Sequence, residues 1–234
     1  MKNIKVTKTQ QVKRVFDHAF QGYDLMNDLM SLGIHRIWKR RLIDWMGPKE
    51  GDCLLDVASG TGDIAKLFLK RIQFKGEVTC IEPNKKMFGL GKIKLKDYKK
   101  VNWICSSAED LPVKRESFDF YTVSFGIRNF SDIDRSLKEA KRVLKNGGRI
   151  MCLEFSKVEN ETLDKIYKFY SKSIPILGKY ITGKSEPYEY LIGSIERFHN
   201  QDELLQKFKE NGFQNVEYRN LSGGIVSIHS GWKI

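Results

Sequence analysis

A glycine turn flanked by acidic side chains is the segment of this sequence best suited to hold a small ligand. Residues 56–63 read DVASGTGD and follow directly on a short apolar run. Glycines permit a tight turn and a close approach of a ligand to the backbone. Glu82 stands twenty residues after Gly62, where an acid can accept both ribose hydroxyls of an adenosine ligand. These residues predict an adenosine-binding site.

Two adenosine ligands compete for this turn. Gly60, Gly62 and Ala65 match the loose dinucleotide fingerprint. A pyrophosphate placed there would, however, meet the like charges of Asp56 and Asp63, whereas S-adenosylmethionine has no phosphate and carries a sulfonium and an ammonium. The charges therefore favour S-adenosylmethionine as the cofactor. The expected contacts are Asp56, Gly60, Gly62 and Glu82.

Alternatively, both acids have only structural roles: Asp56 caps the following helix and Glu82 is an exposed strand end. The ends of two later apolar runs argue against it. Ser107 and Ala108 follow one run, and Ser124, Arg128 and Asn129 end or follow another. In an open parallel sheet, ligands bind beyond the carboxyl ends of the strands. We therefore expect all four strand ends to meet at one site.

The elements that must position these side chains alternate between strand and helix after Pro48. Apolar runs predict strands at residues 53–58, 77–81, 101–104, 118–124 and 149–154, with helices at 63–71, 84–96 and 132–144 between them. Strands and helices at this spacing demand right-handed crossovers and a parallel sheet covered on both faces. A last helix at 201–210 and two strands at 216–219 and 224–229 would complete the fold as a terminal hairpin.

The chain reads as a single domain, residues 1–234, in four parts. Residues 1–48 form N-terminal helices, 49–156 the cofactor-binding core, 157–200 a helical insertion over the site, and 201–234 the C-terminal helix and hairpin. The helices of the first part are expected over residues 12–20, 24–30 and 34–46. The insertion is aromatic and helical, and Pro175, Gly178 and Pro187 are expected to break it.

The composition narrows the class of protein. An apolar content of 41% can bury a full core and excludes a disordered chain. No apolar stretch is long enough to cross a membrane, and no apolar run follows the basic first residues as in a secretory signal. The four cysteines lack CxxC spacing, which indicates buried, reduced thiols in a cytoplasmic protein rather than disulfides or a metal site.

The charge is strongly basic, with 41 lysine and arginine residues against 29 aspartate and glutamate residues and a formal net charge of +12. This balance favours a polyanionic partner, either nucleic acid or an anionic membrane surface. The densest patch, residues 92–100, could equally be a solvated helix face. Charge alone does not choose among these.

Several segments together resemble one family, the ubiquinone/menaquinone biosynthesis C-methyltransferases of the UbiE type. They are residues 23–39, 56–63, 124–129, 142–149, 153–156, 190–195 and 221–232, and they cover nearly the whole chain. The resemblance implies a class I S-adenosylmethionine-dependent methyltransferase fold: Rossmann-like α/β, with a seven-stranded, mostly parallel sheet, helices on both faces and an N-terminal helical extension. It also implies methyl transfer to a ring carbon of a polyprenylated quinol.

By position, the resemblance places cofactor contacts on Thr61, Glu82, Ser107, Ala108 and Ser124. The implied acceptor is 2-polyprenyl-6-methoxy-1,4-benzoquinol, demethylmenaquinol or both; the C-terminal segment is more similar to members of the ubiquinone pathway. Other quinone-biosynthesis enzymes and a second copy of the chain are further possible partners.

Two departures from the family pattern stand out. Ala58 and Ser59 occupy a stretch where a glycine is common, and His199 follows Phe198 where a proline is usual.

The proposed reaction needs an activated ring carbon. A phenol titrates near pH 10, so about one part in a thousand is ionised at neutral pH, and a positioned base would offset that deficit. Arg128, beside Asn129, could stabilise the phenolate or hold a water for proton removal, or could form a structural salt bridge. His35 and Tyr23 are further candidate catalytic residues. His35 could, however, be a packed core residue, and Tyr23 could belong to a helix start capped by Asp24. His229 is a weaker candidate.

The prenyl tail must come from a bilayer. Phe16, Phe20, Trp38, Trp45 and the stretch 167–180 could form an apolar mouth held at anionic lipid by the basic surface, or could be ordinary core. The expected location is therefore cytoplasmic and peripheral to the membrane.

Two other functions compete with quinol methylation. An RNA or DNA methyltransferase would bind phosphates through the basic surface. Enzymes that methylate base amino groups usually carry an Asn/Asp-Pro-Pro-Tyr/Phe segment after the fourth strand, but residues 124–128 read SFGIR here. We therefore expect no nucleic-acid partner. A non-catalytic cofactor-binding subunit would have lost acid or glycine positions that are all present here.

Overall fold

Seven strands form one sheet in the computed structural model, which describes residues 10, 12, 15, 17, 28–183 and 185–234. The spatial order is β3-β2-β1-β4-β5-β7-β6. The strands are β1 Cys53–Val57, β2 Glu77–Ile81, β3 Val101–Ile104, β4 Phe118–Ser124, β5 Leu144–Phe155, β6 Gln214–Leu221 and β7 Val226–Trp232. The first five run parallel, and β7 is antiparallel to both β5 and β6. The predicted mostly parallel sheet with its terminal hairpin is confirmed.

Strand β1 lies at the point where the strand order reverses. It pairs with β2 on one side and β4 on the other, so Asp56 sits opposite Cys80 and Thr122. In such sheets the crevice beyond the carboxyl ends at this point is the place for a ligand. The topology therefore puts the glycine turn after β1 at the centre of that crevice.

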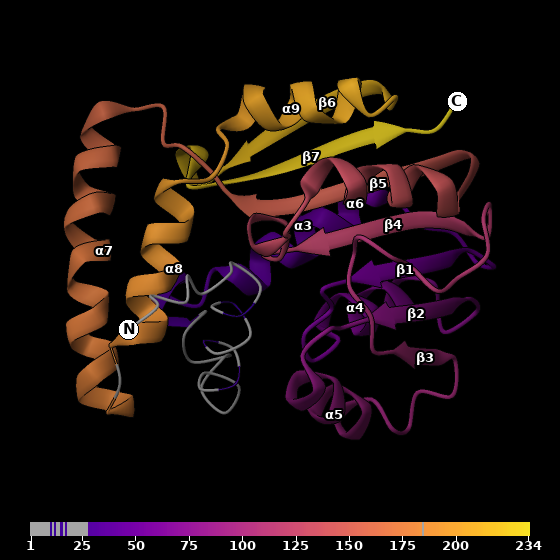
Figure 1. Ribbon diagram of the computed structural model, residues 1–234, viewed down its shortest axis with the longest axis horizontal. Helices are drawn as coiled ribbons and strands as arrows, with labels where there is room; N and C mark the ends of the chain where they lie inside the picture. Colours follow the sequence, from indigo (N-terminus) through magenta and orange to yellow (C-terminus); the bar gives the residue numbers. More distant parts are fainter. Residues whose placement is uncertain (1–9, 11, 13–14, 16, 18–27, 184) are drawn as a thin grey trace, which may run out of the picture.

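Helices cover both faces of the sheet (Figure 1). They are α3 His35–Met46, α4 Asp63–Arg71, α5 Lys85–Lys94, α6 Ile133–Val143, α7 Glu161–Thr182, α8 Glu186–Glu196 and α9 Gln201–Glu210, with 3-10 turns η2 Ile127–Asn129 and η3 Ser222–Gly224. Side chains of β5 alternate between two cores: Met151 joins a cluster with α3, α4, α7 and α8, while Ile150 joins one with α6 and α9.

Short polar residues set where three of these helices begin. The side chain of Asn84 accepts hydrogen bonds from two backbone N–H groups at the start of α5. The side chain of Asp132 accepts one such hydrogen bond at the start of α6. Asn200 forms a capping box with Glu203 at the start of α9. These caps fix the helices on either side of the crevice, and they lie within two residues of the boundaries expected from the sequence.

The insertion after β5 differs from the expectation at its prolines. Pro175 lies inside α7, which runs unbroken from Glu161 to Thr182, and Gly178 does not break it either. A Cβ on Gly178 would overlap the ring of Tyr188, so this glycine serves close packing of α8 on α7. The actual break follows at Gly183, in the left-handed conformation at φ +74°, and Pro187 sits in the first turn of α8.

Two tryptophans expected at an apolar mouth have structural roles instead. Trp38 is buried, packs its ring against Phe125 and Phe155, and donates from Nε1 to Ser222 Oγ at 2.9 Å. Trp45 lies under the guanidinium groups of two arginines. The other two aromatic residues of that prediction, at positions 16 and 20, lie outside the described residues.

All four cysteines are free thiols, as expected, but they are not all buried. Cys80 and Cys152 are buried on central strands, Cys53 is half-buried, and Cys105 is exposed after β3. No helix in the described part of the chain combines the length and the apolar character needed to cross a membrane.

Candidate active site

Two adjoining cavities lie at the carboxyl edge of the sheet and share Ala58, Gly60 and Phe125 in their walls. The larger, of about 210 Å³, is mostly apolar and receives residues from the ends of four strands. Its walls include the predicted residues Gly60, Glu82, Ser107, Ala108 and Asn129, together with Asn84, Met87 and Glu109. The structure thus brings together the strand ends that the sequence singled out.

The smaller cavity, of about 20 Å³, lies on the other side of the glycine turn. Its walls include the predicted residues Asp56, Thr61 and Ser124. Gly62 lines neither cavity but shapes the turn: its φ is +84°, and a Cβ there would lie 2.5 Å from Leu95 Cδ1. Gly62 therefore holds the start of α4 against the helix that follows β2.

Two backbone hydrogen bonds hold the Glu82 carboxylate in place. Its Oε2 accepts from the Gly60 N–H at 2.9 Å and its Oε1 accepts from the Asn84 N–H at 2.8 Å. Burial raises the pKa of Glu82 to about 7, although these two hydrogen bonds oppose the shift. Each carboxylate oxygen keeps a free lone pair, so Glu82 can accept ribose hydroxyls while it holds the glycine turn.

Asp56 and Ser124 present unsatisfied polar atoms to the smaller cavity. Thr122 Oγ1 donates to Asp56 Oδ1 at 2.8 Å, but Asp56 Oδ2 and Ser124 Oγ are buried without a hydrogen-bond partner among the described residues. Burial raises the pKa of Asp56 to about 7. Buried polar atoms of this kind call for a partner, and the ammonium group of an amino-acid ligand would satisfy both.

Asp63 contributes less negative charge than the sequence implied. Its carboxylate pairs with Lys39 Nζ at 2.8 Å and Lys94 Nζ at 2.7 Å, and despite burial these lysines hold its pKa well below the usual range. Lys94 also donates to Thr61 Oγ1 at 2.9 Å. The two lysines neutralise the charge of Asp63 that was expected to repel a pyrophosphate, so the preference for a cation rests on Asp56.

The backbone is strained on both sides of the crevice. Ala58 and Phe125, at the ends of β1 and β4, both have positive φ, +53° and +57°. Residues with a Cβ rarely adopt this conformation, and such strain gathers at functional sites. A Cβ on Gly126 would lie 2.6 Å from the Ala58 Cβ. The departure at position 58 is therefore accommodated by the glycine that faces it.

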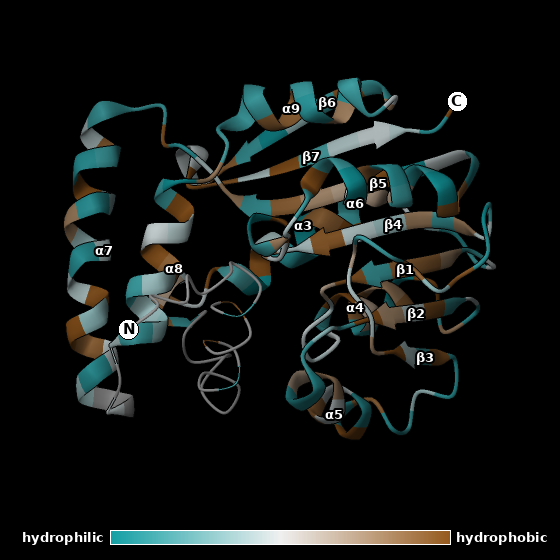
Figure 2. Ribbon diagram, in the orientation of Figure 1, coloured by the Kyte–Doolittle hydropathy of each residue, from teal (hydrophilic) through white to brown (hydrophobic). Residues whose placement is uncertain are grey.

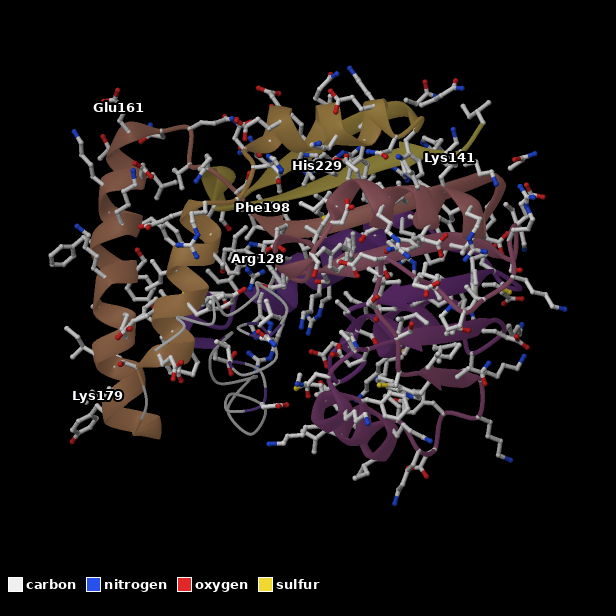
Figure 3. All side chains as sticks on the ribbon, viewed as in Figure 1. Arg128, Lys141, Glu161, Lys179, Phe198 and His229 are labelled. Atoms are coloured by element: carbon white, nitrogen blue, oxygen red, sulfur yellow. The ribbon has the colours of Figure 1, made fainter. Side chains whose placement is uncertain are left out.

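Arg128 is held in a buried ion pair. Its Nη1 donates to Glu154 Oε1 at 2.6 Å and to the Phe125 carbonyl at 2.7 Å, and its Nε donates to Ser194 Oγ at 3.3 Å. Arg128 lines neither cavity. Figure 3 shows it where α8 meets the carboxyl edge of the sheet. The structural salt bridge considered above is therefore present, and Nη2 alone makes no hydrogen bond with the described residues.

Asn129 reaches the larger cavity and connects it to the insertion. The Tyr190 hydroxyl of α8 donates to Asn129 Oδ1 at 3.0 Å. Burial raises the pKa of Tyr190, while Arg128 opposes the shift. Sequence reasoning missed Tyr190 as a site residue, because only the segment resemblance at 190–195 pointed to it and no spacing relates it to Asn129.

The remaining candidates lie elsewhere. His35 is buried, bonds to Asp28 Oδ1 through Nε2 at 2.9 Å and lines neither cavity. His229 is buried on β7 beneath α9, bonds to the Gln201 carbonyl at 2.8 Å and has its pKa lowered to about 4 by burial (Figure 3). Both are packed histidines, which is the alternative considered above for His35. Tyr23 lies outside the described residues.

The second departure from the family pattern leaves its turn intact. Phe198 is buried, and its N–H bonds to the Ile195 carbonyl at 3.2 Å. His199 stacks edge-on against the same ring, and the capping box of α9 begins one residue later. The turn thus forms without a proline.

The model of the ubiE/COQ5 methyltransferase family matches residues 4–233. The chain belongs to this family. Two curated relatives, both named ubiquinone/menaquinone biosynthesis C-methyltransferase UbiE, come from Rickettsia akari and Brucella anthropi. The first is 48% identical over 100% of this chain and 97% of its own length, and the second 46% identical over 95% and 87%.

Solved structures agree on the fold. A methyltransferase from Thermotoga maritima, described as a possible histamine N-methyltransferase, superposes with a TM-score of 0.67 at 20% identity over 95% of this chain and 99% of its own. One from Aquifex aeolicus gives 0.66 at 19% identity over 89% and 97%. The predicted class I fold is confirmed, and this member of the ubiE/COQ5 family is an S-adenosylmethionine-dependent methyltransferase.

Proposed function

We propose that this chain methylates a ring carbon of a polyprenylated quinol in ubiquinone or menaquinone biosynthesis, with S-adenosylmethionine as the donor. The names of its full-length relatives support the reaction. The observation that carries the proposal onto this chain's own residues is the pair of adjoining cavities: Glu82 and Asn129 line the larger, mostly apolar one, and Asp56 lines the smaller one.

The donor would extend through both cavities, with its adenosine in the larger one and its methionyl group in the smaller one. Glu82 would accept the ribose hydroxyls, and Ser107 and Ala108 would flank the adenine in the larger cavity. Asp56 Oδ2 and Ser124 Oγ would hold the methionyl ammonium, with Thr61 beside them in the smaller cavity. S-adenosylmethionine supplies an electrophilic methyl group there. The shared wall of Gly60 and Phe125 sets where that group faces the acceptor.

The acceptor reacts best as a phenolate, because the oxygen lone pair directs electron density to the ortho carbon. In the proposed step a carbon–carbon bond forms as the carbon–sulfur bond breaks, and the ring proton then leaves to solvent. Arg128 Nη2 would stabilise the phenolate or hold the water that takes the hydroxyl proton, while Glu154 fixes the guanidinium. Asn129, held by Tyr190, would position the ring. The apolar cavity suits a step in which two opposite charges disappear.

The proposal also includes a membrane surface and partner proteins. A prenylated substrate resides in a bilayer, so the chain would work in the cytoplasm at an anionic membrane surface. The net charge of +12 supports this. Association with other quinone-biosynthesis enzymes or with a second copy would serve to pass on a poorly soluble substrate.

The direct test is an incubation of the purified protein with methyl-labelled S-adenosylmethionine and, in separate arms, short-tailed demethyl benzoquinol, demethyl naphthoquinol and total RNA. We expect label on a ring carbon of at least one quinol, located by fragmentation in a mass spectrometer, and none in RNA. Label in RNA with unlabelled quinols would overturn the proposal in favour of the nucleic-acid methyltransferase.

A further inference from the structure

Helix α7 carries an apolar stripe, interrupted at Ser173, that no described element covers. Ile166, Phe169, Ile176, Leu177 and Tyr180 recur at three- and four-residue steps through Ser173, which places them on one side of the helix. Phe169 is 82% exposed and Tyr180 92%, and the other three are exposed as well. Scattered exposed apolar residues are ordinary, but a stripe along about four helical turns marks an interaction surface.

The opposite side of α7 is already occupied. Ile174 is fully buried, Gly178 packs on the Tyr188 ring, and the Tyr170 hydroxyl donates to the Leu29 carbonyl. Figure 1 shows α8 between α7 and the sheet, so α7 is the outermost element on the side of the carboxyl edge. Figure 2 shows its hydrophobic residues spread along its length. The stripe therefore faces away from the molecule.

Charge identifies what fits this stripe. Four lysines, Lys165, Lys168, Lys172 and Lys179, are exposed on the same helix, and no acidic residue occurs from Lys165 to its end. On a helical wheel they fall along one border of the stripe. A second copy of the chain docked symmetrically with the two helices antiparallel would bring the two lysine rows toward each other. An anionic lipid surface would neutralise them while the aromatic and aliphatic side chains enter the acyl boundary.

We propose that α7 is an interfacial helix that docks the enzyme on an anionic bilayer, an inference that rests on the proposed action on a prenylated quinol. The helix lies on the membrane rather than spanning it, because lysines and Pro175 interrupt its apolar residues. Docking by this face would set the carboxyl edge of the sheet, and with it the reaction site, close to the surface from which the substrate emerges.

A third cavity lies beside the docking helix, separate from the two cavities of the site. It has a volume of about 470 Å³ and lies between α7, α8 and the residues after β5. Tyr167 lines it, and the Tyr167 hydroxyl is buried without a hydrogen-bond partner among the described residues. Arg128 acts on the same hydroxyl, lowering a pKa that burial raises. Tyr167 therefore presents an unsatisfied hydroxyl to this cavity beneath the docking helix.

The test is co-sedimentation of the full chain with vesicles of phosphatidylethanolamine containing about 30% phosphatidylglycerol, or with phosphatidylcholine vesicles alone. The variant Phe169→Glu/Ile176→Glu should lower the fraction bound to anionic vesicles about tenfold or more. Ile93→Glu makes the same change at a 69% exposed residue on α5, away from α7, and should bind like the wild type. Wild-type binding to phosphatidylcholine should be weaker, and binding to anionic vesicles should fall as salt rises.

Turnover of soluble and membrane-bound substrates by the α7 variant tests membrane docking separately from the proposed methylation. Phe169→Glu/Ile176→Glu should methylate a short-tailed soluble quinol at the wild-type rate but lose turnover of a long-tailed quinol in vesicles. If that variant does not fold, Lys172→Glu/Lys179→Glu, two changes of exposed side chains, should show the same loss of anionic binding. Equal vesicle binding by wild type and a folded α7 variant would overturn the inference. So would a wild-type dimer that binds no vesicles and becomes a monomer when α7 is changed.

Discussion

Asp56 and Glu82 set the electrostatics of the donor site at the scale of single residues. Both carboxyl groups are buried and both have pKa values raised to about 7, far above those of exposed acids. Their raised pKa values reflect the cost of burying two acids, a cost that the charge of Lys39 offsets only in part at Asp56. The amino group of the ligand favours the ionised form of Asp56, and its ribose hydroxyls favour the ionised form of Glu82, so ligand binding and proton release are linked.

This linkage predicts that affinity for S-adenosylhomocysteine rises with pH between 6 and 8. Below pH 7 the two carboxyls are protonated in the free protein, and binding must first remove those protons; above pH 7 they are already ionised. Affinity should fall about tenfold for each carboxyl from pH 8 to pH 6. Titration calorimetry in buffers of different ionisation enthalpy should detect proton release at pH 7. An affinity that does not change over this range would contradict the account.

The residue types of the donor site were predictable from the sequence, because glycine and acid spacing after strands has few other uses. Their partners were not. Nothing in the sequence shows that Lys39 and Lys94 neutralise Asp63, since both lysines come from helices distant in the chain. The same holds for His35 and His229, whose burial depends on packing against Asp28 and α9.

At the scale of elements, the pair Arg128–Glu154 connects η2 to β5 at the edge of the reaction site. Both side chains are almost completely buried, so removing one leaves the other without its partner. We predict that Arg128→Leu lowers the free energy of unfolding by about 3–5 kcal/mol. Arg128→Leu/Glu154→Gln should recover most of that loss, measured by urea unfolding, because no uncompensated charge remains.

Turnover distinguishes the two roles of Arg128. If Nη2 acts on the acceptor, both variants should lose methyl transfer while binding S-adenosylhomocysteine nearly as the wild type does. The double variant is decisive, because it is stable. Recovery of turnover together with stability would show that Arg128 only supports the fold, and the proposed chemistry would have to use another group.

Element boundaries in the core followed from periodicity and caps, and α4 and α9 begin and end where the sequence placed them. The insertion did not follow in the same way. Pro175 and Gly178 are local helix breakers, yet tertiary contact with α8 overrides them: Gly178 makes room for Tyr188, and a proline within a long helix removes only one backbone bond. Such override cannot be read from local sequence.

At the scale of the whole molecule, the sequence predicted the parallel sheet better than the kind of partner that the net charge attracts. Alternating runs sufficed to predict the parallel sheet, because few connections satisfy right-handed crossovers, whereas the strand order and the switch point come from the structure. The net charge of +12 left nucleic acid and membrane equally open. Only the three-dimensional arrangement places lysines along an exposed apolar stripe on α7, and that arrangement favours lipid. The division of the chain at residues 48, 156 and 200 stays a prediction.

The central claim is that buried acids at the switch point select an adenosyl amino acid over a nucleotide diphosphate. Titration calorimetry of S-adenosylhomocysteine and NAD into the wild type and into Glu82→Gln tests it most directly, with Glu77→Gln, an exposed acid at the start of the same strand, as the control. We predict that the wild type and the control bind S-adenosylhomocysteine and not NAD, and that Glu82→Gln binds about tenfold to a hundredfold more weakly. Binding of NAD without S-adenosylhomocysteine, or full affinity in Glu82→Gln, would contradict the account.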